Sequence, residues 1–516
     1  MLRTLFGPCL AFPLLAATAL AQCPSWLPAG VPGQNPFVFA RFDDGSGPAV
    51  YASDAASLLR RWNGTSWSSV PSSPVGGSDL AVGGLGFGGP ERLYSISIYS
   101  TVDSFDGTTT TNLPGVGNLF PWPPVIAVLD DGLGAGNAVF VGGQMSVNGG
   151  PYSAHVARWN GTSWAELGGA IASVRAFESF DDGTGRRLYA GGGFTQAGEI
   201  ARWSGSSWES LPGPRLEGTV TNLRVHDDGA GPALYACGEF TLPVSARVVK
   251  WSGSQWTAVG AAFNSSVSRL ASFDDGSGPA LYATGLFTSV GAVPVAHIAR
   301  WNGTAWSALG AGLDGTAQAL LPATDRASGA PELFVAGNFL NAGGSPAPHV
   351  ARWRGCSFDV FCAGDGADPA VVACPCGNFG GAGRGCANSV NANGAQLAAS
   401  GLPVVAQDTL TLATNGVTGS FALFFQGDAF EGNGTGALLG DGVRCVGGSL
   451  RRLGTRAASG GVATHGFASG SSIASIGLVS AAGGVEYYQA WYRNAASYCT
   501  SDTFNLTNGV RVLWVP

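Results

Sequence analysis

The chain has 516 residues, of which 81 are glycine and 15 are tryptophan, and only 11% of its residues are charged. Ordinary proteins contain roughly 7% glycine and about 25% charged residues. This glycine content, together with 45% hydrophobic residues, favours tight turns between short buried strands and excludes helical bundles, coiled coils and disordered chains. The 26 basic residues are outnumbered by 33 acidic ones, and this net charge of −7 without a basic run excludes nucleic acid as a partner.

Residues 1–21 have the pattern of a signal peptide. Arg3 precedes an apolar run, and Ala19-Leu20-Ala21 supplies the small residues of a cleavage site. The run is shorter than the ~20 residues that span a bilayer, and no later stretch is long and apolar enough. Lipidation at Cys23 is an alternative, although Gln22 stands where a lipobox requires a small residue. We therefore expect a secreted protein, extracellular or at the cell surface, without a transmembrane segment.

A repeat of about 43 to 54 residues organises the chain up to about residue 360. In one unit, strand patterns at 174–179, 187–191, 200–203 and 207–211 alternate with turn residues. The first aromatic residue of the second half recurs seven times, at Trp62, Phe105, Trp159, Trp203, Trp251, Trp301 and Trp353. Repeats with four short strands are typical of propeller blades. The sequence therefore predicts an all-β fold with a seven-bladed β-propeller over residues 22–360.

Most units carry a turn between two aromatic residues, as in Trp62-Asn-Gly-Thr-Ser-Trp67. Asn-Gly suits a two-residue type I′ turn, because both central residues need positive φ. This turn would place Trp62 opposite Thr65, with Trp67 on the same face, so both indoles would pack between blades rather than stack on a ligand. The glycosylation sequons at Asn63, Asn160 and Asn302 coincide with these turns, and their use depends on the source organism.

The repeat resembles the kelch family. Leu188-Tyr-Ala-Gly-Gly192 is similar to the apolar kelch strand that ends in a glycine pair, and Trp203 and Trp208 are similar to the aromatic residues of its third and fourth strands. The resemblance covers residues 37–360 and implies four-stranded propeller blades.

The last unit lacks its second tryptophan, and the missing piece stands at the other end of the chain. Cys23-Pro-Ser-Trp-Leu-Pro-Ala-Gly30 resembles a fourth strand such as 162–168. Since an open propeller exposes two sheet edges, we predict that this segment completes the last blade and that a disulfide between Cys23 and Cys356 seals the ring. Such a bridge would contribute on the order of 4 to 5 kcal/mol in the chain-entropy model.

The repeat stops near residue 361. Strand patterns without helical periodicity then predict a small Cys/Gly-rich β-sandwich over residues 361–516, at Thr409–Ala413, Phe421–Gln426, Val443–Val446, Tyr487–Tyr492 and Val510–Val515. This region is similar to Gly-rich C-terminal modules of other secreted bacterial repeat proteins, a resemblance that implies no activity.

The cysteines of an exported chain favour disulfides over a zinc site, whose two-plus-two spacing is missing. We expect Cys362, Cys374, Cys376 and Cys386 to form two bridges, in one of three connectivities, and Cys445 to pair with Cys499. Cys237 is left as a buried free thiol.

Two recurrent polar features have structural interpretations. The Asp-Asp-Gly turns begin at Asp43, Asp130, Asp181, Asp227 and Asp274, and lack the alternate spacing of a calcium loop, so we interpret them as hairpin turns, with calcium as the alternative. His155, His297 and His349 share one repeat position, but they belong to different units and would lie too far apart for one ion. We interpret them as polar residues where a strand begins.

The sequence contains no metalloprotease, nucleophile-elbow or phosphate-loop motif, and no set of residues that indicates a catalytic, cofactor or metal site. We predict a secreted, monomeric, non-catalytic propeller that acts as an extracellular binding or interaction module for a glycan or a surface protein. One alternative is a glycan-active extracellular enzyme, because paired carboxylates carry no motif. The other is a purely structural cell-surface protein. The loops between second and third strands differ from unit to unit, so we expect any ligand on their face or in its central mouth.

Overall fold

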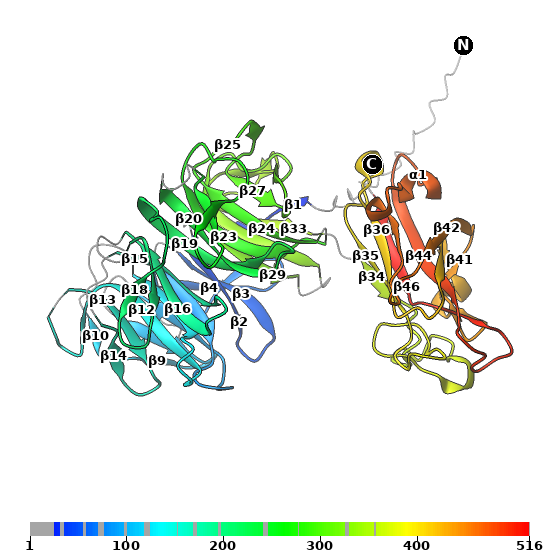
Figure 1. The fold of residues 1–516 in the computed structure, drawn as a ribbon, viewed down its shortest axis with the longest axis horizontal. Helices are drawn as coiled ribbons and strands as arrows, with labels where there is room; N and C mark the ends of the chain where they lie inside the picture. The colour runs from blue at the N-terminus through cyan, green and yellow to red at the C-terminus, as the bar shows by residue number, and fades with distance from the viewer. Residues whose placement is uncertain are drawn as a thin grey trace, which may run out of the picture.

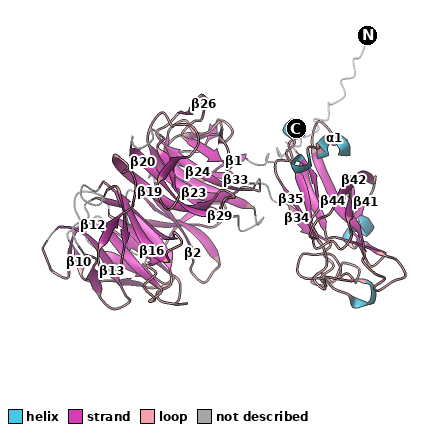
Figure 2. Ribbon diagram, viewed as in Figure 1, coloured by secondary structure: helices cyan, strands magenta, loops and turns pink. Residues whose placement is uncertain are grey.

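The computed structural model describes residues 25–30, 36–54, 58–70, 77–97, 101–117, 124–151, 153–168, 173–193, 198–240, 246–276, 278–325, 330–355 and 358–514. These residues form two bodies, one coloured blue to green and the other yellow to red (Figure 1). Strands make up almost all of the regular structure, and the described chain has one short α-helix, α1 (Ile473–Gly477) (Figure 2). The all-β expectation is confirmed.

Seven antiparallel sheets follow one another up to residue 355, each built on four strands. The first three are β2 (Pro36–Asp43), β3 (Pro48–Asp54), β4 (Leu59–Trp62) and β5 (Trp67–Ser69); β6 (Asp79–Gly83), β7 (Arg92–Ile96), β8 (Val102–Phe105) and β9 (Thr110–Asn112); and β11 (Val125–Asp130), β12 (Asn137–Val147), β13 (Ser153–Trp159) and β14 (Trp164–Glu166), with β10 (Val116–Gly117) added to β12.

The next three sheets are β15 (Val174–Asp181), β16 (Arg186–Gly192), β17 (Ile200–Trp203) and β18 (Trp208–Ser210); β19 (Gly218–Asp227), β20 (Pro232–Phe240), β21 (Val248–Trp251) and β22 (Trp256–Ala258); and β23 (Val267–Asp274), β24 (Pro279–Gly285), β27 (Ile298–Trp301) and β28 (Trp306–Ala308). The last sheet is β29 (Thr316–Thr324), β30 (Pro331–Asn338), β33 (Val350–Arg354) and β1 (Ser25–Pro28). Two short hairpins, β25 (Ser289–Val290) with β26 (Val293–Pro294) and β31 (Asn341–Ala342) with β32 (Ser345–Pro346), stand in the loops of the last two sheets.

The first strands of the seven sheets form a closed ring. Each of them contacts the first strand of the next sheet, in the order β2, β6, β11, β15, β19, β23, β29 and back to β2. Apolar side chains of neighbouring sheets pack between them into shared buried clusters, such as the one that joins Leu281 and Trp301 to Tyr235 of the preceding sheet. Radial sheets that close on themselves in this way make a β-propeller with four-stranded antiparallel blades.

The N-terminal strand closes the last blade, as predicted. β1 pairs antiparallel with β33, so that Trp26 lies opposite Trp353. The blade thus combines strands from both ends of the repeat region, and β1 covers the otherwise open edge of β33. Cys23 and Cys356, the predicted seal, lie outside the described residues, as does the predicted signal peptide.

The second tryptophan of several units joins neighbouring blades through its indole N–H group. In each case Nε1 donates to the carbonyl of a residue that directly follows the fourth strand of the preceding blade. These bonds join Trp67 to Ala29, Trp164 to Leu113, Trp208 to Leu167 and Trp306 to Val259, at 2.7, 3.4, 2.9 and 2.8 Å. The expected packing of the indoles between blades is therefore confirmed.

The predicted two-residue turn between the tryptophans is wrong. Trp62 pairs directly with Trp67, so the loop has four residues. The side-chain oxygen of Asn63 accepts hydrogen bonds from the backbone N–H groups of Thr65 and Ser66, and Asn63 N donates to Ser66 O. Asparagine thus caps a wider turn, because its side chain replaces a backbone acceptor, and the expected pairing of Trp62 with Thr65 does not form.

The C-terminal region contains two main sheets with a common core. The larger comprises β34 (Asp359–Phe361), β46 (Gly509–Trp514), β44 (Gly484–Arg493), β37 (Phe421–Gly427) and β42 (Arg451–Ala457), with β45 (Phe504–Leu506) beside β44; the smaller comprises β35 (Gln396–Ser400), β36 (Thr411–Asn415) and β43 (Thr464–Gly466). Short pairs join β38 (Ala429–Phe430) to β41 (Val446–Gly447) and β39 (Ala437–Leu439) to β40 (Gly442–Arg444). Leu412 of the smaller sheet and Phe424 and Trp514 of the larger share one buried cluster.

Three disulfides cross this region, with a pairing that differs from the prediction. Cys362 is bonded to Cys445, Cys374 to Cys386, and Cys376 to Cys499. The predicted Cys445–Cys499 bridge is therefore wrong, and only one bridge lies within the group 362–386.

Long-range pairing explains this difference. β34, which ends directly before Cys362, pairs with β46, and β46 pairs with β44, where the Gln489 side chain accepts a hydrogen bond from Cys445 N. The carboxylate of Asp441 accepts a hydrogen bond from the backbone N–H group of Cys499. Sequence spacing shows neither contact. Three disulfides indicate an oxidising environment, and no helix in the described part of the chain is long and apolar enough to cross a membrane.

Candidate functional site

A cavity of about 520 Å³ lies where the seven inner strands begin, at one end of the central channel. We call it the mouth cavity. It receives residues from every blade: Val38, Ser78, Asp79, Pro124, Val125, Arg175, Thr221, Ser268, Arg269 and Gln318. Because the blades are antiparallel, the loops between second and third strands emerge at this same end. The mouth cavity therefore belongs to the face on which the sequence predicted a ligand.

β-bulges place four of the lining residues. The pairing of the first two strands slips by one residue between Val174 and Ala176, and the same slip recurs at the equivalent point of the first blade and of three later blades. The extra residue is left unpaired, and a bulge re-aims its side chain. In four of these blades the extra residues are Arg175, Thr221, Ser268 and Gln318, which all line the mouth cavity, and the side chain of Phe37, the extra residue of the first blade, lies outside the described residues. The same β-bulge thus directs four different side chains into the mouth cavity.

The guanidinium of Arg269 is fixed to the cavity wall. Its Nη1 donates to Thr221 O at 3.1 Å and to Ser268 O at 3.2 Å. The hydroxyl of Thr221 in turn donates to Val267 O at 2.7 Å. Arg269 is therefore oriented by two carbonyls from two blades, while its Nε and Nη2 have no bonded acceptor in the described part of the chain.

Asp79 is the carboxylate of the mouth cavity. Its oxygens accept hydrogen bonds from Leu80 N and from Ile126 N of the next blade, both at 3.0 Å. Burial raises the pKa of Asp79 to about 6, although these N–H groups and the charge of Arg269 act in the opposite direction. In a later blade, Asn222 accepts from Leu270 N in the same way. Asp79 thus links two neighbouring blades through its carboxylate and has a raised pKa.

Behind the wall lies Cys237. It is fully buried and unbridged, and burial raises the pKa of its thiol to about 12. The thiol contacts the Thr221 hydroxyl at 3.6 Å. The prediction of a buried free thiol is confirmed, and such a thiol is inert packing.

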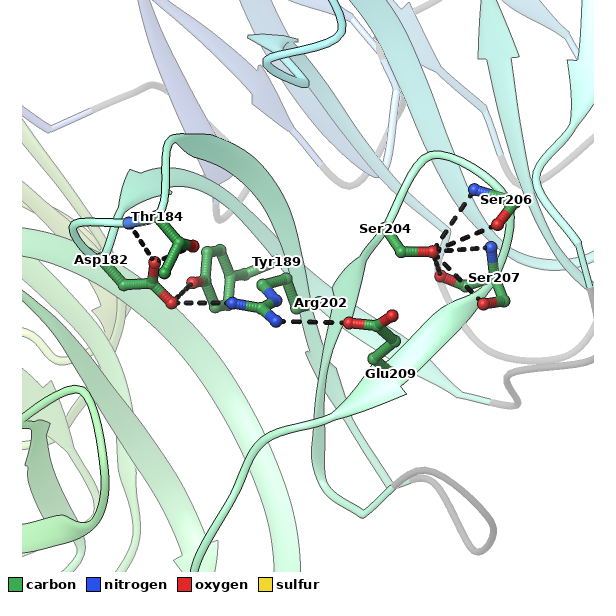
Figure 3. A network of polar contacts seen from close by, with 8 residues as sticks. All are labelled: Asp182, Thr184, Tyr189, Arg202, Ser204, Ser206, Ser207 and Glu209. Atoms are coloured by element: carbon green, nitrogen blue, oxygen red, sulfur yellow. Dashed lines mark hydrogen bonds and ion pairs between the residues drawn. The ribbon is translucent and has the colours of Figure 1, made fainter.

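The Asp-Asp-Gly turns at the opposite end use their two aspartates differently. The first caps the turn: Asp181 Oδ1 accepts from Gly183 N and Gly185 N. The second reaches the blade surface, where Asp182 Oδ2 accepts from Tyr189 Oη at 3.0 Å and from Arg202 Nη1 at 2.9 Å (Figure 3). The interpretation as hairpin turns accounts for the first aspartate but missed this second role.

The second aspartate recurs with the same kind of partners. Asp44 binds Tyr51 and Arg61, and Asp228 binds Tyr235 and Lys250. Burial alone would raise the pKa of Asp182, but hydrogen bonds from Thr184 and Tyr189 and the charge of Arg202 outweigh it and hold this pKa below its usual value. These side chains form repeated ion pairs that join turn, second strand and third strand of one blade.

His297 and His349, two of the three histidines that share a repeat position, each contact their own blade and do not converge. His297 and His349 both adopt positive φ just before the third strand, and each ring Nδ1 lies 3.2–3.3 Å from a carbonyl of its own blade, Gly285 O and Gly337 O. The side chain of His155 lies outside the described residues. Within the described chain, no group of three or more histidine, cysteine or acidic residues could hold a metal ion.

A second cavity, of about 500 Å³, lies in the C-terminal region beside Cys362. Phe361 and Phe430 line it, with ring centroids 4.7 Å apart. Its carboxylates hold their own loops: Asp365 accepts from Ala367 N and Gly383 N, and Asp368 accepts from Ala370 N. These contacts are structural, and they leave the mouth cavity as the better candidate.

Sequence reasoning predicted a ligand on this face but did not single out these residues. Asp79, Asn222 and Arg269 occupy one repeat position of the first strand, directly before Leu80, Leu223 and Leu270, and their differing chemistry was the available signal. This signal was easily missed, because the most conspicuous repeated residues, the tryptophans and the Asp-Asp-Gly turns, belong to the structural framework of the blades.

No family model matches the chain, and no curated protein matches it. Among solved structures it is similar to YCF48 from Cyanidioschyzon merolae, with 12% identity over 64% of this chain and 98% of that one and a TM-score of 0.40. It is also similar to the extracellular domain of the one component system BT4673 from B. thetaiotaomicron, with 12% identity, 76% and 51% coverage and a TM-score of 0.44. The GH74 xyloglucanase from Xanthomonas campestris gives 16% identity, 76% and 60% coverage and a TM-score of 0.41. The propeller assignment rests on the sheet order and ring closure described above.

Proposed function

We propose that this protein is a secreted, non-catalytic binding module, and that its propeller holds a glycan in the mouth cavity. The observation that supports this most is the set of bulged residues: the frame repeats from blade to blade, while the side chains that it presents differ. A rigid scaffold with differing side chains around one concavity suits recognition. The volume of about 520 Å³ lies within the range of small-ligand sites.

Binding is favoured over hydrolysis by the carboxylates. A glycosidase needs two of them flanking the scissile bond. The described lining of the mouth cavity holds one, Asp79, and both of its oxygens accept backbone N–H groups. A glycan-active extracellular enzyme is the first alternative function, and a purely structural cell-surface protein is the second. If the protein is a binding module, a surface protein is the alternative ligand.

Two further parts of the proposal concern origin and family. The three disulfides and the signal-peptide pattern of residues 1–21 support export. The strand order of each blade, with Gly191 and Gly192 ending the second strand before the Trp203 strand, supports kelch-like units. We propose that the protein acts as a monomer and requires no cofactor.

The test is a screen of the purified chain against immobilised polysaccharides, with retention and release of reducing ends scored separately. Retention without release supports the binding module. Release of reducing ends would instead establish the enzyme. An absence of both would contradict the proposal and favour the structural protein.

A further inference from the structure

The disulfide between Cys376 and Cys499 differs from the other two disulfides of the C-terminal region in its surroundings. We propose that it is a thiol-exchange site, at which a small soluble thiol opens the bond and becomes linked to Cys376. The exchange would modify the C-terminal region reversibly, and it does not depend on the binding function proposed for the propeller.

The first argument is access to the sulfur atoms. Of the six bridged cysteines in the described chain, Cys376 alone is exposed, and its partner Cys499 is partly buried. A Cβ atom added at Gly377 would meet no other atom within 4 Å, so open space lies beside the turn that carries Cys376. Residues 495–498, directly before Cys499, are also exposed. A thiolate must reach a sulfur atom to exchange with it, and this bond lies between two exposed loops.

The other two disulfides are covered by protein. Their four cysteines are between 1 and 8% exposed: Cys362, Cys374, Cys386 and Cys445. Gly364 packs on one bond so closely that a Cβ atom there would lie 2.8 Å from both of its sulfur atoms, and a Cβ atom at Gly436 would lie 3.0 Å from the sulfur of Cys362. Buried disulfides of this kind resist exchange while the protein is folded.

The proposed reaction conserves atoms and electrons. The thiolate of the incoming molecule attacks Cys376 Sγ and forms a new sulfur–sulfur bond. The bond between Cys376 and Cys499 breaks, and Cys499 leaves as a thiolate that takes up a proton from water. The sulfur of the incoming thiol is oxidised and that of Cys499 is reduced, so the reaction needs no other oxidant or reductant. The products are a mixed disulfide on Cys376 and a free thiol on Cys499.

Asp441 keeps both halves of the opened bond in place. Its Oδ1 accepts hydrogen bonds from Cys499 N at 3.1 Å and from Thr500 N at 2.7 Å. Its backbone carbonyl accepts from Nδ2 of Asn378, two residues after Cys376, at 3.2 Å. Asp441 is itself fully buried. None of these bonds involves a sulfur atom, so they remain when the disulfide opens. The Cys499 thiol therefore stays near Cys376 and displaces the bound thiol once the free thiol is removed.

The test is incubation of the purified full chain with excess reduced glutathione at about pH 8, where a fraction of the thiol is ionised. Samples are quenched with acid and mapped as peptides without reduction. We expect the fragment that links Cys376 to Cys499 to disappear about tenfold or more faster than the other two linked fragments. Glutathione should appear on Cys376. The two buried disulfides serve as controls within the same chain, and a thermal melt shows that it stays folded.

The reversal is tested with Thr500→Val. The Thr500 hydroxyl donates to Asp441 Oδ1 at 2.9 Å and accepts from Asp502 N, so its loss loosens the loop that carries Cys499. After glutathione is removed, the disulfide should re-form about fivefold more slowly in this variant than in the parent chain. Thr503→Val is the matched control, because the Thr503 hydroxyl accepts from Arg493 Nη1 instead, and its rate should change less than about twofold.

Several results would overturn the proposal. Loss of all three linked fragments at one rate, earlier loss of the fragment that links Cys374 to Cys386, or no loss from the folded chain would show that exposure does not select the bond. Glutathione on Cys499 instead of Cys376 would reverse the assigned attack. A disulfide that stays open after glutathione is removed would contradict the role of Asp441. If Thr500→Val does not fold, the comparison of the three fragments in the parent chain decides.

Discussion

The indole Nε1 of Trp26 donates a hydrogen bond of 2.9 Å to Leu309 O, which lies 283 residues further along the chain. It repeats the bond that Trp306 makes to Val259 O between the two preceding blades. Trp26 also packs edge-on against Trp353, with ring centroids 5.3 Å apart. The N-terminal segment thus supplies the strand, the aromatic pair and the inter-blade bond that the units with Trp67, Trp164, Trp208 and Trp306 supply for themselves.

Replacing Trp26 should therefore open the ring. Trp26→Ala removes a large side chain from the closing blade and should lower the free energy of unfolding by about 3–5 kcal/mol. Trp26→Phe keeps most of the packing and loses the N–H donor, for about 1 kcal/mol. Thermal and urea unfolding measure both. A Trp26→Ala variant as stable as the parent chain would show that β1 does not hold the ring closed.

The Asp182 ion pair predicts a defined dependence on pH. The folded pKa of Asp182 lies below its ordinary value of 3.8, so its contribution to stability is present above that value and is lost as the pH falls through the folded pKa. Asp182→Asn should lower the free energy of unfolding by about 1–2 kcal/mol at pH 7. The difference between the two proteins should shrink towards pH 2. A difference that is constant across this range would contradict the assigned charge.

Asp79 should show the opposite dependence. Its pKa is raised from 3.8 to about 6, so the carboxylate lowers stability increasingly as the pH rises from 3.8 through 6. Asp79→Asn, which copies Asn222, should be more stable than the parent by on the order of 1–2 kcal/mol at pH 7.5 and equal to it near pH 4. Paired melts at these two pH values measure this. A variant that is less stable at pH 7.5 would show that the charged form is needed for the ring.

The disulfides can be read directly by peptide mapping without reduction. Fragments should join Cys362 to Cys445, Cys374 to Cys386 and Cys376 to Cys499. Cys237 should react with an alkylating reagent only after unfolding, because it is fully buried. In the chain-entropy model the bridge from Cys376 to Cys499, which spans 123 residues, contributes about 4–5 kcal/mol, so Cys376→Ser with Cys499→Ser should melt markedly earlier. A fragment that joins Cys445 to Cys499 would contradict the structure.

The same peptide map tests whether a disulfide closes the propeller ring. The predicted Cys23–Cys356 bridge would appear as one fragment that links the two ends of the propeller. Alkylated Cys23, or Cys23 paired with a C-terminal cysteine, would contradict it.

The propeller could be predicted from sequence because its determinants are local and repeated. Most units contain the residues that form their own strands, their Asp-Asp-Gly cap and their tryptophans, and the last unit, which lacks its second tryptophan, points to Trp26. The width of the turn after Trp62 could not be predicted in this way, because Asn63 serves equally well in a two-residue turn and as the cap of a four-residue loop.

The mouth cavity and the disulfide pairing were less accessible because both depend on contacts between distant segments. Arg269 becomes an oriented donor only when Thr221 of the neighbouring blade supplies a carbonyl. Cys362 meets Cys445 only because β34 adds to β46 and Gln489 holds Cys445. No spacing in the sequence contains these relationships.

The central claim is that the mouth cavity is where the propeller binds its ligand. The most direct measurement compares Ser268→Trp with Ser69→Trp by calorimetric titration of the glycan that the parent chain retains. Ser268 is a bulged residue of the cavity, whereas Ser69 is exposed on β5, the outer strand of its blade. We predict that tryptophan at 268 abolishes binding while tryptophan at 69 leaves it unchanged, with both variants folded. Undiminished binding by Ser268→Trp would contradict the claim.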